Sequence, residues 1–362
     1  MKIAILGTRG IPNYYGGFEQ FAQYLSEGLV GLGHEVSVYN SHNHPYQEDT
    51  WNGVDIIHCF DPEEKLGTAG QFVYDLNCIL DSRKRNFDVI LQLGYTSSSV
   101  WNWLFSKSAV IVTNMDGLEW KRSKYSKPVQ TFLKIAEKLA VQFSDFLIAD
   151  SEGIKGYLAG KYKKESVYIP YGADLFAEEQ AKVLSEYGLL PYQYDMLIAR
   201  LEPENSIEEI LDGFLASDVK RQFLVIGNTN TKFGKYISSK TTDKRVLFVG
   251  YVNGIEKLDS LRHFSNLYFH GHTVGGTNPS LLEAMASSAL ICANDNIFNK
   301  AILGEDAFYF SNASDVSVLL QNNLKTEKHI FVSNNLQKIK NRYSWKSIIF
   351  EYEQFFKTCL NK

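Results

Sequence analysis

The sequence predicts an α/β protein built from two doubly wound, Rossmann-like domains that face each other across a cleft. Three observations predict it: a length of 362 residues, short apolar runs that alternate with helical segments, and two successive rounds of that alternation. A chain of this length ordinarily forms two domains. Continuous apolar runs separated by helices are typical of a parallel sheet covered on both faces, and ligands of such sheets bind at the carboxyl ends of the strands.

The first round begins with an expected strand at Lys2–Leu6 and a helix over residues 17–32, which Gly33 and His34 end. A second helix is expected over Pro128–Phe143. The other strands of this round are expected at Glu35–Tyr39, Asp55–Cys59, Val89–Leu93, Ala109–Thr113, Phe146–Ala149 and Val167–Ile169.

The second round follows a polar joint near Tyr171–Leu190. Its strands are expected at Asp195–Ala199, Gln222–Ile226, Val246–Val249, Leu267–His270, Leu290–Ala293 and Ala307–Phe310.

The formal net charge of -4 does not favour wholesale nucleic-acid binding. The 4 cysteines are scattered without metal-ligand spacing, which indicates buried thiols in a reducing compartment. The chain starts directly on a strand and has no apolar run of membrane-spanning length, so we expect a cytoplasmic protein that associates at most with the inner membrane face.

A small, polar, glycine-bearing loop runs into an apolar helix at Gly275–Ala286. The amides of Gly275, Gly276, Thr277 and Asn278, together with the dipole of the following helix, suit a diphosphate. Glu283, one turn into the helix, is then expected to accept hydrogen bonds from sugar or ribose hydroxyls. An ordinary helix capped by Asn278 or Ser280 explains the same pattern, and the two interpretations are equally weighted.

The loop after the first strand, residues 7–19, does not have the glycine spacing of a dinucleotide fingerprint, and the second strand ends in Asn40 without the expected acid. Gly16 and Gly17 instead place amides at a helix start, where they could approach a phosphate or the transferred group. A mobile glycine hinge is the alternative.

Several segments together resemble the family-4 retaining glycosyltransferases. They are Pro12–Glu19, Gly33–Val36, Ala149–Glu152, Ile169–Asp174, Ala199–Glu204, Gly275–Ala286 and Tyr343–Lys346. Two segments, Thr113–Trp120 and residues 274–279, are more narrowly similar to the bacterial rhamnosyltransferase branch of surface-polysaccharide assembly.

The resemblance implies a GT-B architecture. Residues 1–172 would form an acceptor-binding domain to which a last helix, residues 345–362, returns, and residues 173–344 would bind the nucleotide-sugar donor. The implied activity moves L-rhamnose from dTDP-rhamnose to a lipid-linked saccharide, with retention of configuration. The alternatives are another donor such as UDP-GlcNAc or UDP-glucose, a GT-B sugar-nucleotide epimerase, and a sugar-binding protein without catalytic activity.

The chain departs from the family pattern at three places. Gly275 occupies the position of the first of two glutamates, Asn205 stands where a lysine is expected, and Asp116 stands where many members have a histidine. Arg200 matches the diphosphate-binding arginine. The absence of the first glutamate is consistent with a donor sugar whose hydroxyls are arranged differently, such as a 6-deoxy sugar.

Bond cleavage at a glycosyl phosphate leaves negative charge on the nucleotide diphosphate. The sequence has no Asp-x-Asp triplet for a metal, so Arg200 and the amides of Gly16, Gly17, Gly276 and Thr277 are expected to stabilise that charge without a metal cofactor. The resemblance implies a front-face substitution in which the donor phosphate takes the acceptor proton.

Asp116 follows the expected strand Ala109–Thr113 and is the best candidate for an active-site carboxylate, with a turn cap at Gly117 as the alternative. Glu119 is a weaker candidate. His270 and His272 border the glycine loop. They could donate hydrogen bonds to a phosphate, and the alternative is that they have no functional role.

A basic and aromatic stretch, Trp120–Lys127, follows Asp116, and Lys134 and Lys138 extend it. Its residues Trp120, Lys121 and Arg122 are placed on the acceptor side of the site. Such a run is ordinarily a solvated face, but here an anionic membrane surface or a polyprenyl-diphosphate acceptor would be attracted to it.

Overall fold

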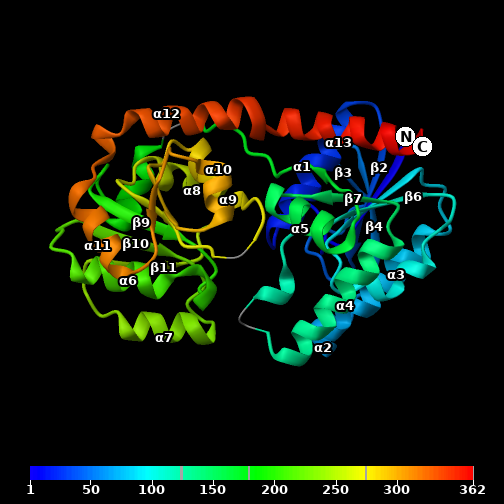
Figure 1. Ribbon diagram of the computed structural model, residues 1–362, viewed down its shortest axis with the longest axis horizontal. Helices are drawn as coiled ribbons and strands as arrows, with labels where there is room; N and C mark the ends of the chain where they lie inside the picture. Colours follow the sequence, from blue (N-terminus) through cyan, green and yellow to red (C-terminus); the bar gives the residue numbers. More distant parts are fainter. Residues whose placement is uncertain (123–124, 178–179, 274, 362) are drawn as a thin grey trace. The chain divides into compact units, whose positions relative to one another are not determined.

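The computed structural model describes residues 1–122, 125–177, 180–273 and 275–361. The chain divides into two compact units. The first contains residues 1–121, 125–172 and 345–362, and the second contains residues 173–344 together with Arg122. Figure 1 colours both units along the chain, so the red C-terminal helix is seen among the blue N-terminal elements of the first unit.

The first unit contains an eight-stranded sheet in the order β3-β4-β2-β1-β5-β6-β7-β8. Its strands are β1 (Lys2–Leu6), β2 (Glu35–Ser41), β3 (Thr50–Trp51), β4 (Val54–Cys59), β5 (Val89–Leu93), β6 (Val110–Asn114), β7 (Phe146–Ala149) and β8 (Val167–Tyr168). All neighbours are parallel except the edge pair β3 and β4. The short edge strand β3 was not predicted, because two residues beside a turn are too few to show an alternation of polar and apolar side chains.

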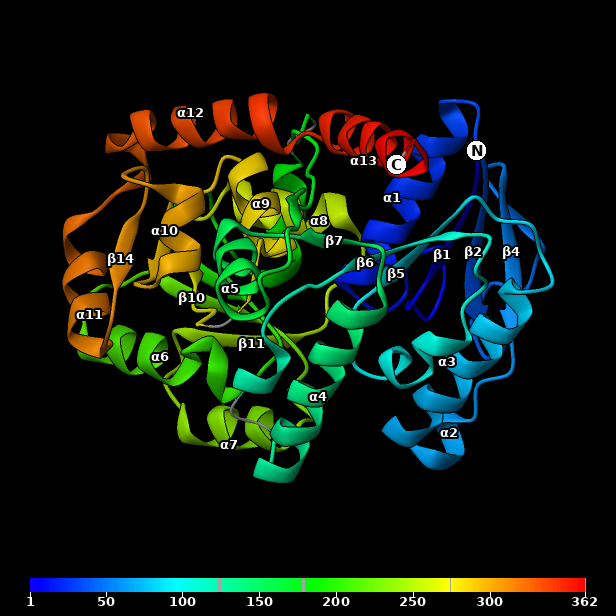
Figure 2. The ribbon, with the colours of Figure 1, turned by 45° about the vertical axis from the view of Figure 1, so that its right-hand side comes forward.

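Helices cover both faces of this sheet. They are α1 (Gly17–Gly31), α2 (Glu63–Leu66), α3 (Thr68–Ser82), α4 (Lys127–Phe143), α5 (Glu152–Tyr162) and α13 (Trp345–Leu360). α13 packs closely on α1, because a Cβ atom at Gly28 would lie 2.3 Å from Ile349. Phe21 of α1 contacts the rings of Trp345 and Tyr352 in the same interface, and Figure 2 shows α1 beside α13.

The second unit contains a fully parallel six-stranded sheet in the order β11-β10-β9-β12-β13-β14. Its strands are β9 (Tyr194–Ile198), β10 (Gln222–Ile226), β11 (Val246–Gly250), β12 (Tyr268–His270), β13 (Ile291–Asn294) and β14 (Phe308–Phe310). Its helices are α6 (Ile207–Ala216), α7 (Lys232–Lys240), α8 (Ile255–His263), α9 (Pro279–Ala286), α10 (Ile297–Leu303), α11 (Ala313–Asn322) and α12 (His329–Lys338). The α/β prediction with two doubly wound parallel sheets is confirmed.

Each sheet has one place where the order of strands reverses. In the first unit the chain builds outward from β1 to β4 and then returns to the other side of β1 with β5 (Figure 2). In the second unit it builds from β9 to β11 and then returns beside β9 with β12. Ligands of open parallel sheets bind outside the carboxyl ends of the strands at such a reversal. A ligand site is therefore expected at the loops that follow β1, β5, β9 and β12.

Candidate functional site

Arg200 lies at the carboxyl end of β9, on one side of the strand reversal in the second unit. Its side chain is exposed, and it has no hydrogen-bond or ion-pair partner among the residues that the structure describes. The loop that carries it is ordered by Asn205, whose side-chain amide donates to the Arg200 carbonyl over 2.7 Å. Asn205 thus closes the loop, and Arg200 presents an uncompensated cation at the edge where a ligand is expected.

The glycine loop follows β12 on the other side of the same reversal. Gly275 has φ of +145°, a conformation that side chains rarely adopt, and a Cβ atom there would meet nothing within 4 Å. Asn278 caps α9 by accepting from the Ser280 amide over 2.9 Å, whereas the Ser280 hydroxyl lies 2.8 Å from the Tyr268 hydroxyl. Of the two residues proposed as the ordinary cap, Asn278 has that role. The backbone of Gly276 and the buried Thr277 leads into this helix start.

Glu283 is bound to a residue that the sequence analysis missed. Its Oε2 accepts from the guanidinium of Arg262 over 2.6 Å, and Arg262 also lies 2.6 Å from Asp259. Arg262 is 1% exposed, and burial raises the pKa of Asp259. One carboxylate oxygen of Glu283 is therefore committed to an internal ion pair, and the network fixes where the other oxygen lies. Nothing in the sequence marks Arg262, because it lies 21 residues before its partner.

In the first unit, the expected amide donors lie at the start of α1, beside the strand reversal. α1 begins at Gly17, and the amide of Gly16 donates to Asn13 Oδ1 over 3.1 Å. The Gly16 amide is thus used within the loop, and Gly17 is the first residue of the helix. Glu19, in the first turn, accepts from the amide of Arg9 over 3.0 Å.

The same edge contains further paired charges that the sequence analysis did not single out. Arg9 forms two hydrogen bonds to Glu63, of 2.7 and 2.9 Å. Asp75 is buried and accepts from the Ser97 hydroxyl over 2.6 Å, and burial raises its pKa to about 7. These residues surround the loops after β1, β4 and β5, where polar ligands of the first unit would lie.

Asp116 lies just past the end of β6, as expected. Its φ is +37°, which is uncommon for a residue other than glycine, and its amide donates to Asn114 Oδ1 over 3.1 Å. Asn114 is itself held by the hydroxyl of Tyr352 from α13, 3.2 Å away. A backbone conformation that is uncommon for a residue other than glycine and is held by its surroundings recurs at functional positions.

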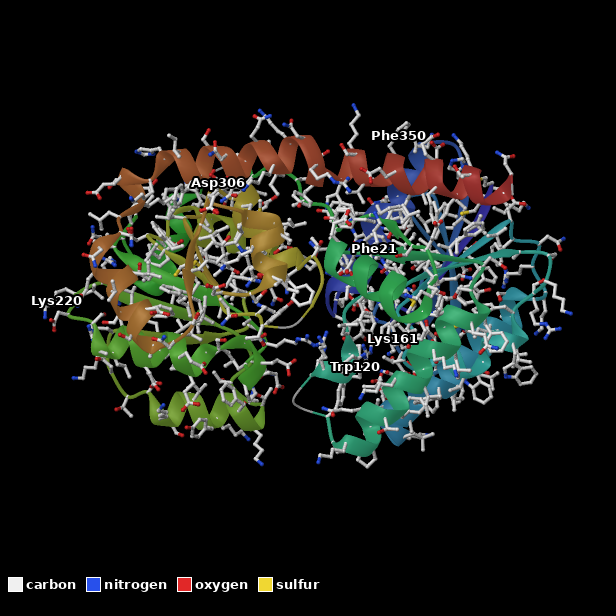
Figure 3. All side chains as sticks on the ribbon, in the orientation of Figure 1. Phe21, Trp120, Lys161, Lys220, Asp306 and Phe350 are labelled. Atoms are coloured by element: carbon white, nitrogen blue, oxygen red, sulfur yellow. The ribbon has the colours of Figure 1, made fainter. Side chains whose placement is uncertain are left out.

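Trp120 is anchored inside the first unit. Its indole N–H donates to Glu137 over 3.0 Å, and Glu137 also accepts from Tyr157, Lys161 and Tyr162 over 2.8, 2.8 and 2.6 Å. The ammonium group of Lys161 lies 5.7 Å from the centre of the Trp120 ring, and Figure 3 shows the two side chains close together. Trp120 therefore serves first to hold the loop between β6 and α4.

The remaining acceptor-side candidates are dispersed. Glu119 and Lys121 lie in the short helical turn Glu119–Lys121, and Lys121 lies 5.6 Å from the Trp120 ring. Arg122 groups with the second unit, where its guanidinium is 3.7 Å from Glu204. Lys124, part of the expected basic stretch, lies outside the described residues.

Comparisons with known proteins place this geometry in context. A family described as a domain of unknown function, DUF1972, matches residues 1–174. The chain is 21% identical over 309 residues, 77% of each chain, to an uncharacterized glycosyltransferase of Methanocaldococcus jannaschii. Among solved structures it is similar to sucrose-phosphate synthase of Thermosynechococcus elongatus, with a TM-score of 0.81, 16% identity, and 99% of this chain and 98% of that chain covered.

The chain is also similar to Anabaena HepE in complex with UDP-glucose, with a TM-score of 0.77, 16% identity, and 99% and 100% of the two chains covered. The chain has the GT-B fold. The likeness extends over both units, so the two doubly wound sheets are the two halves of this GT-B architecture. Glycosyltransferases thus recur among the proteins that it is similar to.

Across residues 1–122, 125–177, 180–273 and 275–361, no group of three or more His, Cys, Asp or Glu side chains is placed to hold a metal ion. No helix in the described parts of the chain has both the length and the apolar character that crossing a membrane requires.

Proposed function

We propose that this protein is a glycosyltransferase that moves a sugar from a nucleotide-diphosphate donor to a hydroxyl of an acceptor saccharide. The observation that carries the proposal is the exposed Arg200, which has no partner among the described residues and lies across the strand reversal of the second unit from the glycine loop. The GT-B fold of the whole chain supports the proposal. HepE, a protein of similar fold, has a crystal structure in complex with UDP-glucose, which supports it too.

In this proposal the second unit binds the donor. The guanidinium of Arg200 and the amides around Gly276 and Thr277 stabilise the charge that develops on the leaving diphosphate. Glu283, positioned by Arg262, accepts a hydrogen bond from a hydroxyl of the ribose or sugar. Without an Asp-x-Asp triplet, the proposed transfer needs no metal, and EDTA should leave its rate unchanged.

The first unit provides the acceptor side of the proposed reaction. Asp116 orients the attacking hydroxyl or stabilises positive charge on the sugar ring. The hydroxyl attacks the anomeric carbon on the face from which the diphosphate leaves, and the donor phosphate takes its proton. The new bond therefore retains the configuration of the old one. Analysis of the product by NMR, through its anomeric coupling constants, tests retention directly.

We propose L-rhamnose from dTDP-rhamnose as the transferred sugar, because Gly275 removes a carboxylate that would otherwise meet the hydroxyls of the donor. UDP-glucose and UDP-GlcNAc are the alternative donors, and the HepE complex favours a uridine nucleotide. A thermal-shift panel of nucleotide sugars separates these possibilities, since a ligand at 100 times its Kd adds about 2.7 kcal/mol to the free energy of unfolding.

We propose a lipid-linked saccharide as the acceptor, presented at an anionic membrane surface to which the first unit binds peripherally. The exposed side of α4 supports this, because it presents Lys127, Lys134, Lys138 and the 53% exposed Ile135, whereas its one acidic residue, Glu137, is buried. Each basic residue near an anionic surface contributes about 1 kcal/mol. Flotation with anionic liposomes at low salt should recover the protein, and absence from the lipid fraction would refute this part of the proposal.

The decisive experiment incubates the purified protein with nucleotide sugars and a saccharide acceptor. Glycosyl transfer, with nucleotide diphosphate released only when acceptor is added, would support a transferase. Conversion of the donor without acceptor would support a sugar-nucleotide epimerase instead. Binding without any turnover would favour a sugar-binding protein.

A further inference from the structure

Two buried histidines meet at the strand reversal of the second unit. His270 is the last residue of β12 and is 1% exposed, and His272 follows two residues later with its ring half-buried. Their rings stack with centroids 4.4 Å apart and planes 14° apart. The Arg200 guanidinium, after β9, is near enough to His272 to act on its charge, and the glycine loop that leads to α9 follows the pair along the chain.

The ring nitrogens of this pair differ from those of His44, which is also 1% exposed. Both ring nitrogens of His270 and the buried Nδ1 of His272 have no hydrogen-bond partner within the described part of the chain. In contrast, His44 is bound through both nitrogens to the backbone of Tyr46 and Pro12. Leaving a buried polar group without a partner costs about 1–3 kcal/mol, so such groups ordinarily have a reason to persist.

The backbone around His272 is held firmly from two neighbouring loops. Its carbonyl accepts from Asn296 over 2.9 Å and from Asn299 over 3.2 Å. On the other side, a Cβ atom at Gly271 would lie 2.0 Å from the carbonyl oxygen of Asn205, so the loops after β9 and β12 touch there. The imidazole is thus preorganised by its support.

The surroundings keep both rings uncharged. Burial and the nearby Arg200 guanidinium lower the pKa of His272 to about 3. Burial and the neighbouring His272 ring also lower the pKa of His270 well below its usual value. A neutral imidazole carries no positive charge with which to attract a phosphate, and Arg200 already provides that charge. It donates at one nitrogen and accepts at the other, as a sugar hydroxyl also does.

We propose that His272, backed by the stacked ring of His270, binds an uncharged hydroxyl of the sugar carried by a nucleotide-sugar donor. This inference rests on the proposed function and makes it more specific: Arg200 reads the diphosphate, and His272 reads the sugar.

Calorimetric titration of the full-length protein tests this assignment. The probes are UDP, dTDP, UDP-glucose, UDP-GlcNAc and dTDP-rhamnose. We expect His272→Phe to weaken the preferred nucleotide sugar about tenfold while the matching free nucleotide changes less than twofold. His272→Gln, which keeps a donor and an acceptor, should recover part of the loss. His329→Gln, on the exposed start of α12, is the matched control and should change neither affinity.

The outcomes distinguish failure of the proposed function from failure of the His272 assignment. If the wild-type protein binds none of the nucleotide sugars, the proposed function fails and this assignment falls with it. If the wild type binds one and the His272 variants keep its full advantage over the free nucleotide, only the assignment of His272 is wrong. Equal weakening of nucleotide and nucleotide sugar would place His272 on the phosphates and would also overturn it. Thermal melting of each variant separates loss of binding from loss of fold.

Discussion

The polar side chains at the carboxyl edges of the two sheets differ in whether they have hydrogen-bond or ion-pair partners. In the first unit, Arg9 is paired with Glu63, and Glu137 collects four donors around Trp120 and Lys161. In the second unit, Arg200 and the stacked histidines have no such partners among the described residues. Polar groups that satisfy one another stabilise a loop, whereas preorganised groups without partners mark where a ligand is to be bound.

The largest effect is expected inside the second unit, at the buried ion pairs of Arg262 with Asp259 and Glu283. Arg262→Met would leave Asp259 and Glu283 facing each other without the cation, and loss of one partner from a buried ion pair costs about 3–5 kcal/mol. Urea unfolding measures the change. Arg85→Met removes an exposed pair to Asp81 and should cost less than about 1 kcal/mol. Similar values for the two variants would show that the Arg262 cluster is not structural.

The next effect tests the unpaired side of the comparison. Arg200→Ala should leave the free energy of unfolding nearly unchanged, because the side chain is exposed. It should raise the barrier of sugar transfer by about 3–4 kcal/mol, since one donor to the leaving diphosphate is lost. Steady-state kinetics measures it, with exposed Arg83→Ala as the control. Near-normal kinetics for both Arg200→Ala and Glu283→Gln would reject the site.

A pH effect is expected in the first unit. Burial raises the pKa of Asp75 to about 7, above its unfolded value, so the native state holds this proton more tightly. Stability is then highest below the unfolded pKa and falls as the pH rises towards 7, by roughly 2 kcal/mol between pH 5 and pH 7. Asp75→Asn should remove this fall. Parallel stability profiles for the wild type and the variant across that range would show that Asp75 does not titrate as expected.

The smallest effect concerns the anchoring of the loop after β6. Trp120→Phe removes one hydrogen bond to Glu137 and should cost about 1 kcal/mol, while nucleotide binding in the second unit stays unchanged. Trp103→Phe is matched to it, because Trp103 is 63% exposed and donates only to the carbonyl of Val100. Equal stability of the two variants would mean that the buried carboxylate does not hold the loop. A change in nucleotide affinity on Trp120→Phe would contradict the expectation that Trp120 only stabilises the first unit.

The strand prediction succeeded where the signal was local. The runs Lys2–Leu6, Val89–Leu93, Phe146–Ala149 and Gln222–Ile226 are strands with those bounds, because a parallel strand covered on both faces is apolar over most of its length. The edge strand β3 was missed, since two residues bonded to one neighbour need no such pattern.

The sequence by itself determined the α/β class, the two rounds of strand and helix, and the loops at their carboxyl ends, because apolar periodicity and glycines act over a few residues. Only the tertiary structure decided which side chains in those loops are already committed. It showed that Arg262 holds Glu283, that Glu137 holds Trp120, and that His270 and His272 stack with unpaired nitrogens. Each of these facts depends on contacts between different secondary-structure elements or on burial, and neither is written in the order of residues along the chain.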